Sequence, residues 1–198
     1  MKFRPDVPAE VVFCVVAVCW IGFGGILFFG KKGAAKVEKK RDLKSHFGFL
    51  LQCLAYAICF TFYRPYFSPF VAMSRAWEVV LAGVTIAIAI ASEWLCFAAA
   101  RALGRQWALV ARVIEGHELI EQGPYALVRN PIYLAMIGML LAIGMAVSRW
   151  PALVAALVVF FAGNEIRIRS EEKLLREAFG AKFDGYARRV PSVFPRLL

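Results

Sequence analysis

The chain has 198 residues, enough for one domain or two small ones, and 61% of them are apolar, against about 45–50% in typical soluble domains. Charged residues make up only 19%, yet the formal net charge is +10, so most of the few charges are basic. This composition excludes a disordered chain, a collagen-like fibre and a disulfide-stapled secreted module. It indicates an integral membrane protein.

We predict five membrane-spanning helices, because five apolar runs approach the roughly 20 residues needed to cross a bilayer. In chain order these runs are 11–30, 47–63, 77–100, 131–147 and 151–163. The first run lacks an Ala-x-Ala-like cleavage site and is expected to remain as a span rather than to be removed as a signal peptide. Only three residues separate the last two runs, so they should form an antiparallel hairpin. The fifth helix should continue through Asn164 into the charged segment beyond.

The basic residues predict the orientation of the spans. Nineteen of the 24 lysines and arginines fall in residues 31–44, in residues 101–130 or after Gly163. Five spans put these three regions on one side, which should be the cytosol, with the N-terminus outside. We therefore expect a multi-pass membrane protein whose basic flanks contact anionic membrane lipids. Because the charge is split among three membrane-flanking regions, we do not expect nucleic-acid binding.

The expected fold class is all-α, a polytopic membrane helical bundle. Residues 1–100 should form an N-terminal three-span region, and residues 101–198 a second region that contains the helical hairpin. In the latter, the 101–130 segment and the C-terminal helix and tail should face the cytosol beside the hairpin, and any chemistry is expected where they meet. No metal site is expected, since the five cysteines lie in apolar runs without a Cys-x-x-Cys pair and only two histidines exist.

A turn and a helix start lie between the third and fourth spans. Gly123-Pro124 predicts the turn, because proline fixes its own φ and favours extended backbone before it. Pro131 fits the first turn of the fourth span, where a missing N–H costs nothing. Residues 117–120 should then form an extended strip folded back against the start of a helix. Taken singly, residues such as Tyr125 could simply be interfacial aromatics.

The charged helix after Asn164 pairs residues at i, i+4 spacing, namely Glu165 with Arg169, Arg167 with Glu171, and Glu172 with Arg176. One interpretation is a surface helix with weak ion pairs. However, Arg167 and Glu171 extend the fifth span at a depth where ionisable groups are costly and usually functional. Gly180 should end this helix, and residues 186–195 should form a closing tail.

Several motifs follow one another in a fixed order along this half of the chain. They are His-x-Leu at 117–119, Gly-Pro-Tyr-x-x-x-Arg-Asn-Pro-x-Tyr at 123–133, Arg-x-x-x-Glu-Glu at 167–172, Phe-Gly at 179–180 and Tyr-x-x-x-Val-Pro at 186–191. Together they resemble the isoprenylcysteine carboxyl methyltransferase family, part of a wider group of membrane methyltransferases that includes the phospholipid N-methyltransferases. Asn130 stands where most relatives have His, so no acid–base role is expected there.

The resemblance, which includes bacterial members of the family, implies a protein of the bacterial inner membrane whose residues 101–198 are the catalytic region. It implies that S-adenosyl-L-methionine binds on the cytosolic side, in a pocket formed by the 101–130 segment and the C-terminal helix and tail. The residues implied to line its pocket are His117, Glu118, Leu119, Ile120, Tyr125, Asn130, Pro131, Ile132, Tyr133 and Glu171. Arg167 is implied to contact the substrate, and Arg167 and Glu171 form the expected catalytic pair. These residue types suit the roles, because aromatic faces attract a sulfonium and a guanidinium can hold a carboxylate in a fork.

Three functions are weighed. The first is methyl transfer to the carboxylate of a lipophilic substrate, such as a prenylated cysteine, that enters from the bilayer; this nucleophile is already ionised and needs no base. The second is N-methylation of a phospholipid amine, which needs a base such as Glu171, Glu172 or His117. The third is a non-enzymatic transporter subunit with Gln52 and Glu93 as polar points in its path. Glu93 could instead be a carboxylate partnered at a helix interface.

Overall fold

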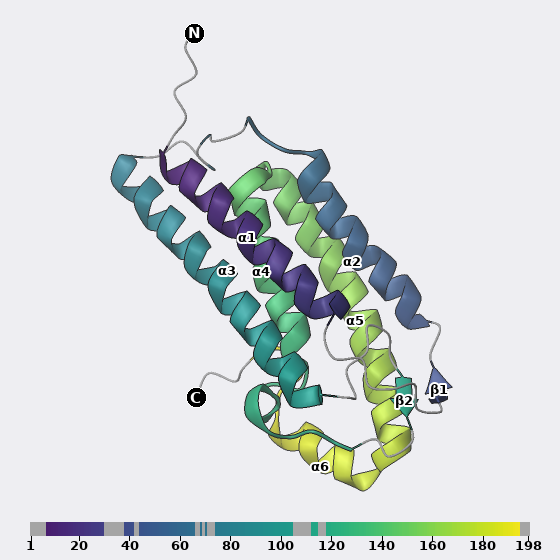
Figure 1. The fold of residues 1–198 in the computed structure, drawn as a ribbon. Helices are drawn as coiled ribbons and strands as arrows, with labels where there is room; N and C mark the ends of the chain where they lie inside the picture. The colour runs from purple at the N-terminus through teal and green to yellow at the C-terminus, as the bar shows by residue number, and fades with distance from the viewer. Residues whose placement is uncertain are drawn as a thin grey trace.

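The computed structural model describes residues 7–29, 38–41, 44–65, 68, 70, 74–104, 112–114 and 118–194. Within these residues, five long helices form a bundle and a sixth, shorter helix lies at one end (Figure 1). The helices are α1 Val7–Phe29, α2 Lys44–Thr61, α3 Arg75–Leu103, α4 Pro131–Val147, α5 Trp150–Phe179 and α6 Ala181–Arg189. Each of the five predicted apolar runs overlaps one of the helices α1 to α5, so the five helices and the all-α class are confirmed, and that all five cross the membrane stays a prediction.

The outer surface of the bundle is apolar. Large side chains such as Ile21 on α1, Trp94 on α3 and Val158 on α5 are exposed, Ile21 to 74%. Water would make such a surface unfavourable, whereas lipid would not. Among the described residues, α1, α3 and α5 are long and apolar enough to cross a membrane, and α4 is apolar but has only 17 residues. The structure is thus that of a multi-pass membrane protein.

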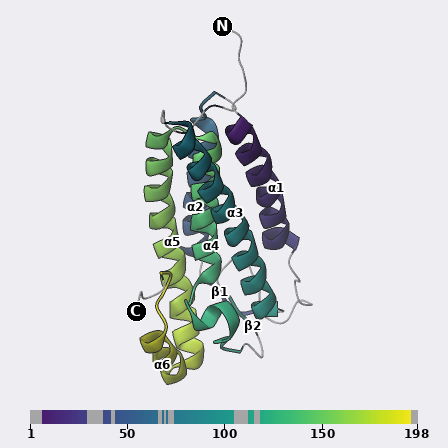
Figure 2. The same cartoon turned by 90° about the vertical axis from the view of Figure 1, so that its left-hand side faces the viewer.

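Helix α4 lies at the centre of the bundle. It contacts α1, α2, α3 and α5, and 12 of its 17 residues are buried. Figure 2 shows it between α3 and α5. A helix that is apolar on every side can contact other helices all round, and α4, the shortest of the five long helices, occupies that central position.

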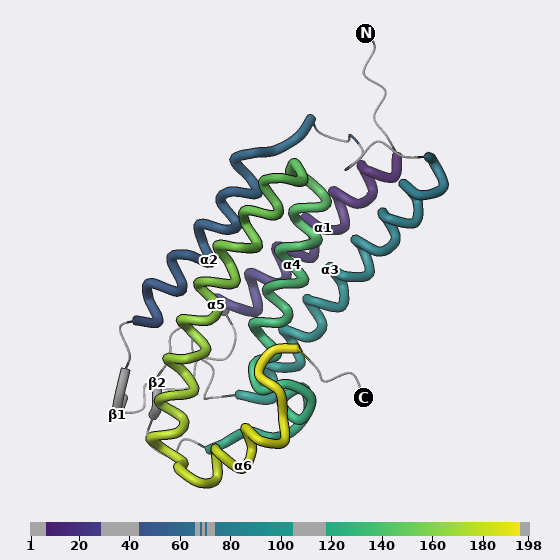
Figure 3. Tube along the Cα trace, turned by 180° about the vertical axis from the view of Figure 1, so that it is seen from behind, coloured from purple at the N-terminus to yellow at the C-terminus, as the bar shows by residue number. Residues whose placement is uncertain are grey.

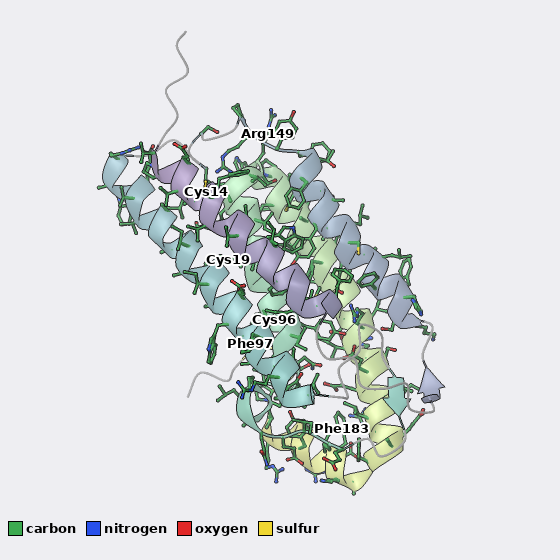
Figure 4. All side chains as sticks on the ribbon, viewed as in Figure 1. Cys14, Cys19, Cys96, Phe97, Arg149 and Phe183 are labelled. Atoms are coloured by element: carbon green, nitrogen blue, oxygen red, sulfur yellow. The ribbon has the colours of Figure 1, made fainter. Side chains whose placement is uncertain are left out.

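The predicted hairpin of α4 and α5 is confirmed, and its turn is closed by a residue that the sequence analysis does not single out. Arg64, just after α2, donates from Nη1 to the carbonyl of Ser148 and from Nη2 to the carbonyls of Met145 and Ala146, each at 2.8 Å. A cation at a helix C-terminus satisfies carbonyls that have no partner within the helix. Figure 4 labels Arg149 at this turn and Phe183, on α6, at the opposite end of the bundle.

Helix α5 extends beyond the other spans. Its 30 residues reach about 45 Å at 1.5 Å per residue, more than the roughly 30 Å of a hydrocarbon core. As predicted, it continues from the apolar run into the charged segment and ends at Gly180, whose φ of 51° is unfavourable for residues with a Cβ. The chain then turns back in α6 beneath the bundle (Figure 3).

Two expectations for this C-terminal part are corrected. Residues 186–189 belong to α6, so the closing tail begins at Val190. The pairing of Glu165 with Arg169 is confirmed at 2.6 Å, but Glu172 pairs with Arg129 rather than Arg176. Arg176 instead contacts Asp184 across the bend between α5 and α6, at 2.8 Å. For Glu172 and for Arg176 alike, a partner supplied by tertiary packing replaces the one expected from helix spacing.

A short antiparallel pairing joins two segments at the same end of the molecule as α6. Strand β1, Glu38–Arg41, pairs with β2, Arg112–Ile114, so that Glu38 lies opposite Ile114 and Arg41 opposite Arg112. The pairing links the segment after α1 to the segment after α3. No strand is predicted at either segment, because four residues in β1 and three in β2, without alternating hydrophobicity, form no strand pattern.

Candidate functional site

Three side chains meet where the start of α4 lies against the charged half of α5. The hydroxyl of Tyr133 donates a hydrogen bond to Oε1 of Glu171. Nη2 of Arg167, one helical turn earlier on α5, lies 3.7 Å from the same oxygen. The guanidinium of Arg167 also lies over the Tyr133 ring, 5.0 Å from its centre. The structure therefore brings together the two predicted catalytic residues and one predicted cofactor-binding residue.

These three side chains differ in exposure. Arg167 and Tyr133 are both 4% exposed, whereas the side chain of Glu171 is 27% exposed. The carboxylate is thus the part of the cluster that an incoming ligand can reach first. The guanidinium lies beneath it, against the bundle, where its charge is screened less by water than at the surface.

A residue of α2 completes the surroundings of Arg167. Nη1 of Arg167 donates to Oε1 of Gln52 at 2.8 Å, and Nε2 of Gln52 donates to Oδ1 of Asn164 at 3.1 Å. The Phe49 ring lies 5.6 Å from the guanidinium. From the sequence alone, Gln52 is expected only as a polar side chain along the substrate path of a possible transporter subunit. The available signal was its place as the one strongly polar side chain in the second apolar run.

The backbones of α2 and α5 approach each other closely, and this makes the hydrogen bond between Gln52 and Arg167 possible. A Cβ added at Gly48 would lie 2.6 Å from the carbonyl oxygen of Gly163 and 2.6 Å from Cγ of Arg167. A Cβ added at Gly163 would lie 2.7 Å from the carbonyl oxygen of Gly48. Small residues at a helix interface allow such an approach in membrane proteins. The two glycines thus set the distance across which Gln52 reaches Arg167.

The next carboxylate on α5 belongs to a different cluster. Oε1 of Glu172 accepts from Nε of Arg129 at 3.0 Å and from Nη2 at 2.7 Å. Nη1 of Arg129 also donates to the carbonyls of Ala187, at 2.9 Å, and Val190. Arg129 thereby ties the segment before α4 to α5, to the end of α6 and to the tail. Its guanidinium therefore attaches segments of the protein to one another and does not extend toward lipid headgroups.

Asn130 takes part in the same attachment of the tail. Its side-chain amide donates to the carbonyl of Ser192 at 3.1 Å. The backbone N–H groups of Arg129 and Asn130 donate to the carbonyls of Pro191 and Ser192, both at 2.9 Å. Asn130, which is predicted to line the cofactor pocket, is thus hydrogen-bonded to the C-terminal tail in the structure. Its role toward a cofactor stays a prediction.

Tyr125 lies in the predicted turn, which forms the short 3₁₀ helix η2, Gly123–Ala126. The Tyr125 side chain is buried, and its carbonyl accepts a hydrogen bond from the hydroxyl of Tyr186 at 2.7 Å. Burial, together with the negative charge of Glu171, raises the pKa of Tyr125 well above its usual value. Burial raises the pKa of Tyr186 to about 12. Both phenols are therefore neutral at physiological pH, and Tyr125 lies within electrostatic reach of Glu171.

The predicted strip before the turn is described in part. Residues 118–121 adopt neither helix nor strand. Glu118 is exposed, whereas Leu119 and Ile120 are half-buried and Ile120 packs against the apolar core. His117 lies outside the described residues. The described part of the strip thus leads into η2 with irregular backbone, and its role toward a cofactor stays a prediction.

The remaining predicted residues open α4. Pro131 is its first residue, as expected, and both Pro131 and Ile132 are buried. Both side chains are apolar, so they offer no polar group to a ligand, and their role toward a cofactor stays a prediction. Among the residues that the structure describes, no group of three or more His, Cys, Asp or Glu side chains is arranged to hold a metal ion.

The two polar points considered for a transport path lie in different interfaces. Gln52 faces α5, as described above, whereas Glu93 lies between α1 and α3. A Cβ added at Gly22 on α1 would collide with the Glu93 carboxylate. Cys19, one turn earlier on α1, also contacts Glu93. Glu93 is therefore a carboxylate packed at a helix interface.

Comparison with known proteins identifies the family. The family described as phospholipid methyltransferase matches residues 77–182, just over half of the chain. The nickel-cobalt-cadmium resistance protein NccN of Alcaligenes xylosoxydans xylosoxydans is 39% identical over 97 residues, 48% of this chain and 45% of that protein. The cobalt-zinc-cadmium resistance protein CzcN of Cupriavidus metallidurans is 38% identical over 97 residues, 48% of this chain and 44% of that protein.

A third relative, the uncharacterized protein YpbQ of Bacillus subtilis, is 28% identical over 103 residues, 52% of this chain and 58% of that protein. The chain thus matches about half the length of each of these curated relatives. The family match begins at the start of α3 and ends within α6, and so includes Tyr125, Tyr133, Arg167 and Glu171. The chain belongs to the phospholipid methyltransferase family of membrane proteins.

Proposed function

We propose that this protein transfers a methyl group from S-adenosyl-L-methionine to the carboxylate of a lipophilic acceptor, such as a prenylated cysteine, at the cytosolic face of the membrane. Members of its family are generally methyltransferases that use this cofactor. The observation that carries the proposal is the contact of Tyr133, Glu171 and Arg167 where the apolar bundle gives way to polar segments.

The proposed topology has α2 and α4 crossing the membrane together with α1, α3 and α5, with the N-terminus outside. The structure supports it through the position of the basic segments. The end of α3, the start of α2 and the end of α5 all lie at the end of the bundle that carries α6 (Figure 1). The cytosolic leaflet favours such basic flanks. In this orientation the site opens to the compartment that supplies the cofactor.

The residues of the site fit the proposed cofactor. S-adenosyl-L-methionine supplies a methyl group activated on a sulfonium, and it carries a cationic ammonium group as well. Glu171 offers a partly exposed carboxylate to one of these cations, and the Tyr133 hydroxyl holds that carboxylate in place. The Tyr125 phenol, neutral and buried, adds an aromatic face nearby. The 118–120 strip offers backbone groups outside any helix or strand.

Arg167 favours an anionic acceptor. Its buried guanidinium attracts a carboxylate and repels an ammonium, and burial strengthens both effects. A carboxylate is ionised near neutral pH and needs no general base, so the site has only to align it with the methyl group and to exclude water. An acceptor with a long apolar chain could reach this position sideways from the bilayer.

The test compares two acceptors with methyl-labelled cofactor. Purified protein should transfer label to N-acetyl-S-farnesylcysteine as a base-labile ester, and not to phosphatidylethanolamine. Arg167→Lys should greatly reduce this transfer, because lysine cannot hold a carboxylate in a fork. Arg169→Lys, an exposed arginine on the same helix, is the matched control.

The outcomes separate the alternatives. Labelled phospholipid that resists base would indicate an amine acceptor, and equal activity of Arg167→Lys and Arg169→Lys would remove Arg167 from the site. Folded protein that binds no S-adenosylhomocysteine in isothermal titration would contradict the enzyme altogether and favour the transporter subunit.

A further inference from the structure

We propose that Gln52 is a positioning residue that orients Arg167 toward the acceptor, so that α2 is part of the catalytic unit. The inference rests on the proposed function. It concerns a helix that lies wholly before residues 77–182, the part of the chain that matches the family. It therefore adds to the site a residue that the family match does not reach.

The hydrogen bonds between these side chains have only one possible polarity. A guanidinium donates and never accepts, so Gln52 must present its Oε1 to Arg167. Its Nε2 is then directed to Asn164, which must present Oδ1. The side chain of Asn164 orients the Gln52 amide, and the Gln52 amide in turn accepts a hydrogen bond from the guanidinium of Arg167. Gln52 thus has one orientation, and Arg167 has a fixed acceptor.

Because Gln52 is buried, its hydrogen bond determines where the guanidinium of Arg167 lies. Gln52 is 1% exposed and lies in the α2–α5 interface, where water cannot replace a lost partner. An arginine side chain has several rotatable bonds, and its position in a site depends on what holds it. The Gly48–Gly163 contact fixes the distance between the two helices. Gln52 therefore holds the guanidinium at a set depth beside Tyr133 and Glu171.

Two substitutions test this in different ways. Gln52→Leu removes the acceptor at nearly constant volume and leaves Nη1 of Arg167 without this hydrogen bond. Gln52→Glu keeps the shape and the acceptor but adds a negative charge that neutralises the guanidinium. Both variants should weaken the binding of an anionic acceptor. Neither touches the carboxylate of Glu171, so cofactor affinity should change little.

The experiment measures initial rates with N-acetyl-S-farnesylcysteine and, separately, with varied S-adenosyl-L-methionine. Leu54→Ala, an exposed apolar position on the same helix, is the matched control. In both Gln52 variants the acceptor KM should rise about tenfold to one-hundredfold, the range expected when a buried hydrogen bond to a charged group is lost. The cofactor KM and the affinity for S-adenosylhomocysteine should stay within about threefold of the control, which a general loss of structure would not allow.

The results distinguish failure of this inference from failure of the proposed function. If wild-type protein methylates the probe and both Gln52 variants keep the acceptor KM of Leu54→Ala, the positioning role is wrong and the function stands. If wild-type protein binds S-adenosylhomocysteine but methylates no carboxylate probe, the proposed acceptor and this inference fail together. If Gln52→Leu does not fold, the acceptor KM of the isosteric Gln52→Glu decides the question alone.

Discussion

Neighbouring carboxylates on α5, Glu171 and Glu172, meet two arginines in two different ways. Arg129 approaches Oε1 of Glu172 with two nitrogens, the closer at 2.7 Å, and its third nitrogen donates to main-chain carbonyls. Arg167 stays 3.7 Å from Oε1 of Glu171, and a tyrosine hydroxyl takes the closer position on that oxygen. One pair is a closed set of hydrogen bonds, whereas the other leaves a partly exposed carboxylate above a buried cation.

Under the proposed function, this difference separates structural attachment from ligand binding within one helical turn. All three guanidinium nitrogens of Arg129 are engaged, and two of its acceptors are carbonyls of the chain itself, so the Arg129–Glu172 pair holds α4, α6 and the tail together. The Arg167–Glu171 pair is the one proposed to exchange its long contact for ligands of opposite charge, one on each residue. The predictions below test whether the two pairs can be separated experimentally.

The largest expected effect is on stability. Arg129→Met should leave Glu172 without its cationic partner and release the tail. Removing one partner of a buried pair costs about 3–5 kcal/mol, and because these side chains are 13% and 15% exposed we expect the lower end of that range. The melting temperature in detergent measures this. Arg169→Met, which breaks a surface pair, is the control, and an equal shift in both variants would contradict the role of Arg129.

The second prediction concerns ligand affinity. Glu171→Gln removes the charge proposed to pair with the cofactor and should weaken S-adenosylhomocysteine binding about tenfold to one-hundredfold. Glu172→Gln should instead lower the melting temperature and change the affinity much less. Isothermal titration of both variants, with exposed Glu165→Gln as the control, gives the comparison. Equal losses of affinity at the two positions would show that the pairs do not differ in function.

The third prediction concerns the distance between α2 and the Arg167–Glu171 pair. Gly48→Ala adds a methyl group 2.6 Å from a backbone oxygen of α5, so the helices must separate, at a cost of about 1–3 kcal/mol. Gly24→Ala on α1 adds the same group where nothing lies within 4 Å and is the control. Melting temperature and acceptor KM should both change in Gly48→Ala only. A variant with unchanged values would mean that the close approach is not required.

The smallest effect is expected at the rim. Arg189 contacts Glu121 at 2.8 Å, but the two side chains are 69% and 29% exposed. Exposed pairs contribute at most about 1 kcal/mol, so Arg189→Ala should shift the melting temperature only slightly, and less at high salt. A loss as large as that of Arg129→Met would contradict the division drawn between attached and solvated arginines.

Much of the fold could be predicted because its signals are local. Apolar runs gave the positions of α1 to α5, the short separation at Arg149 gave the hairpin, and Gly180 gave the end of α5. The Arg167–Glu171 pair was likewise visible as i, i+4 spacing on a helix that leaves the membrane. Periodicity and special backbone residues suffice for such features.

The missing parts depend on contacts between distant segments. Gln52 lies 115 residues from Arg167, and only the packing of α2 on α5 brings them together. Spacing suggested Arg176 for Glu172, but Arg129, 43 residues away, takes that position. The acceptors of Arg64 and several acceptors of Arg129 are main-chain carbonyls, which every residue possesses, so no sequence pattern could identify them.

The attachment of the final residues through their carbonyls has a practical consequence. Arg129 and Asn130 bind oxygen atoms of Pro191 and Ser192 that would be present whatever the side chains were. This stretch should therefore accept many substitutions and yet not accept a change in length, since one inserted or deleted residue would shift every carbonyl out of register with its donor.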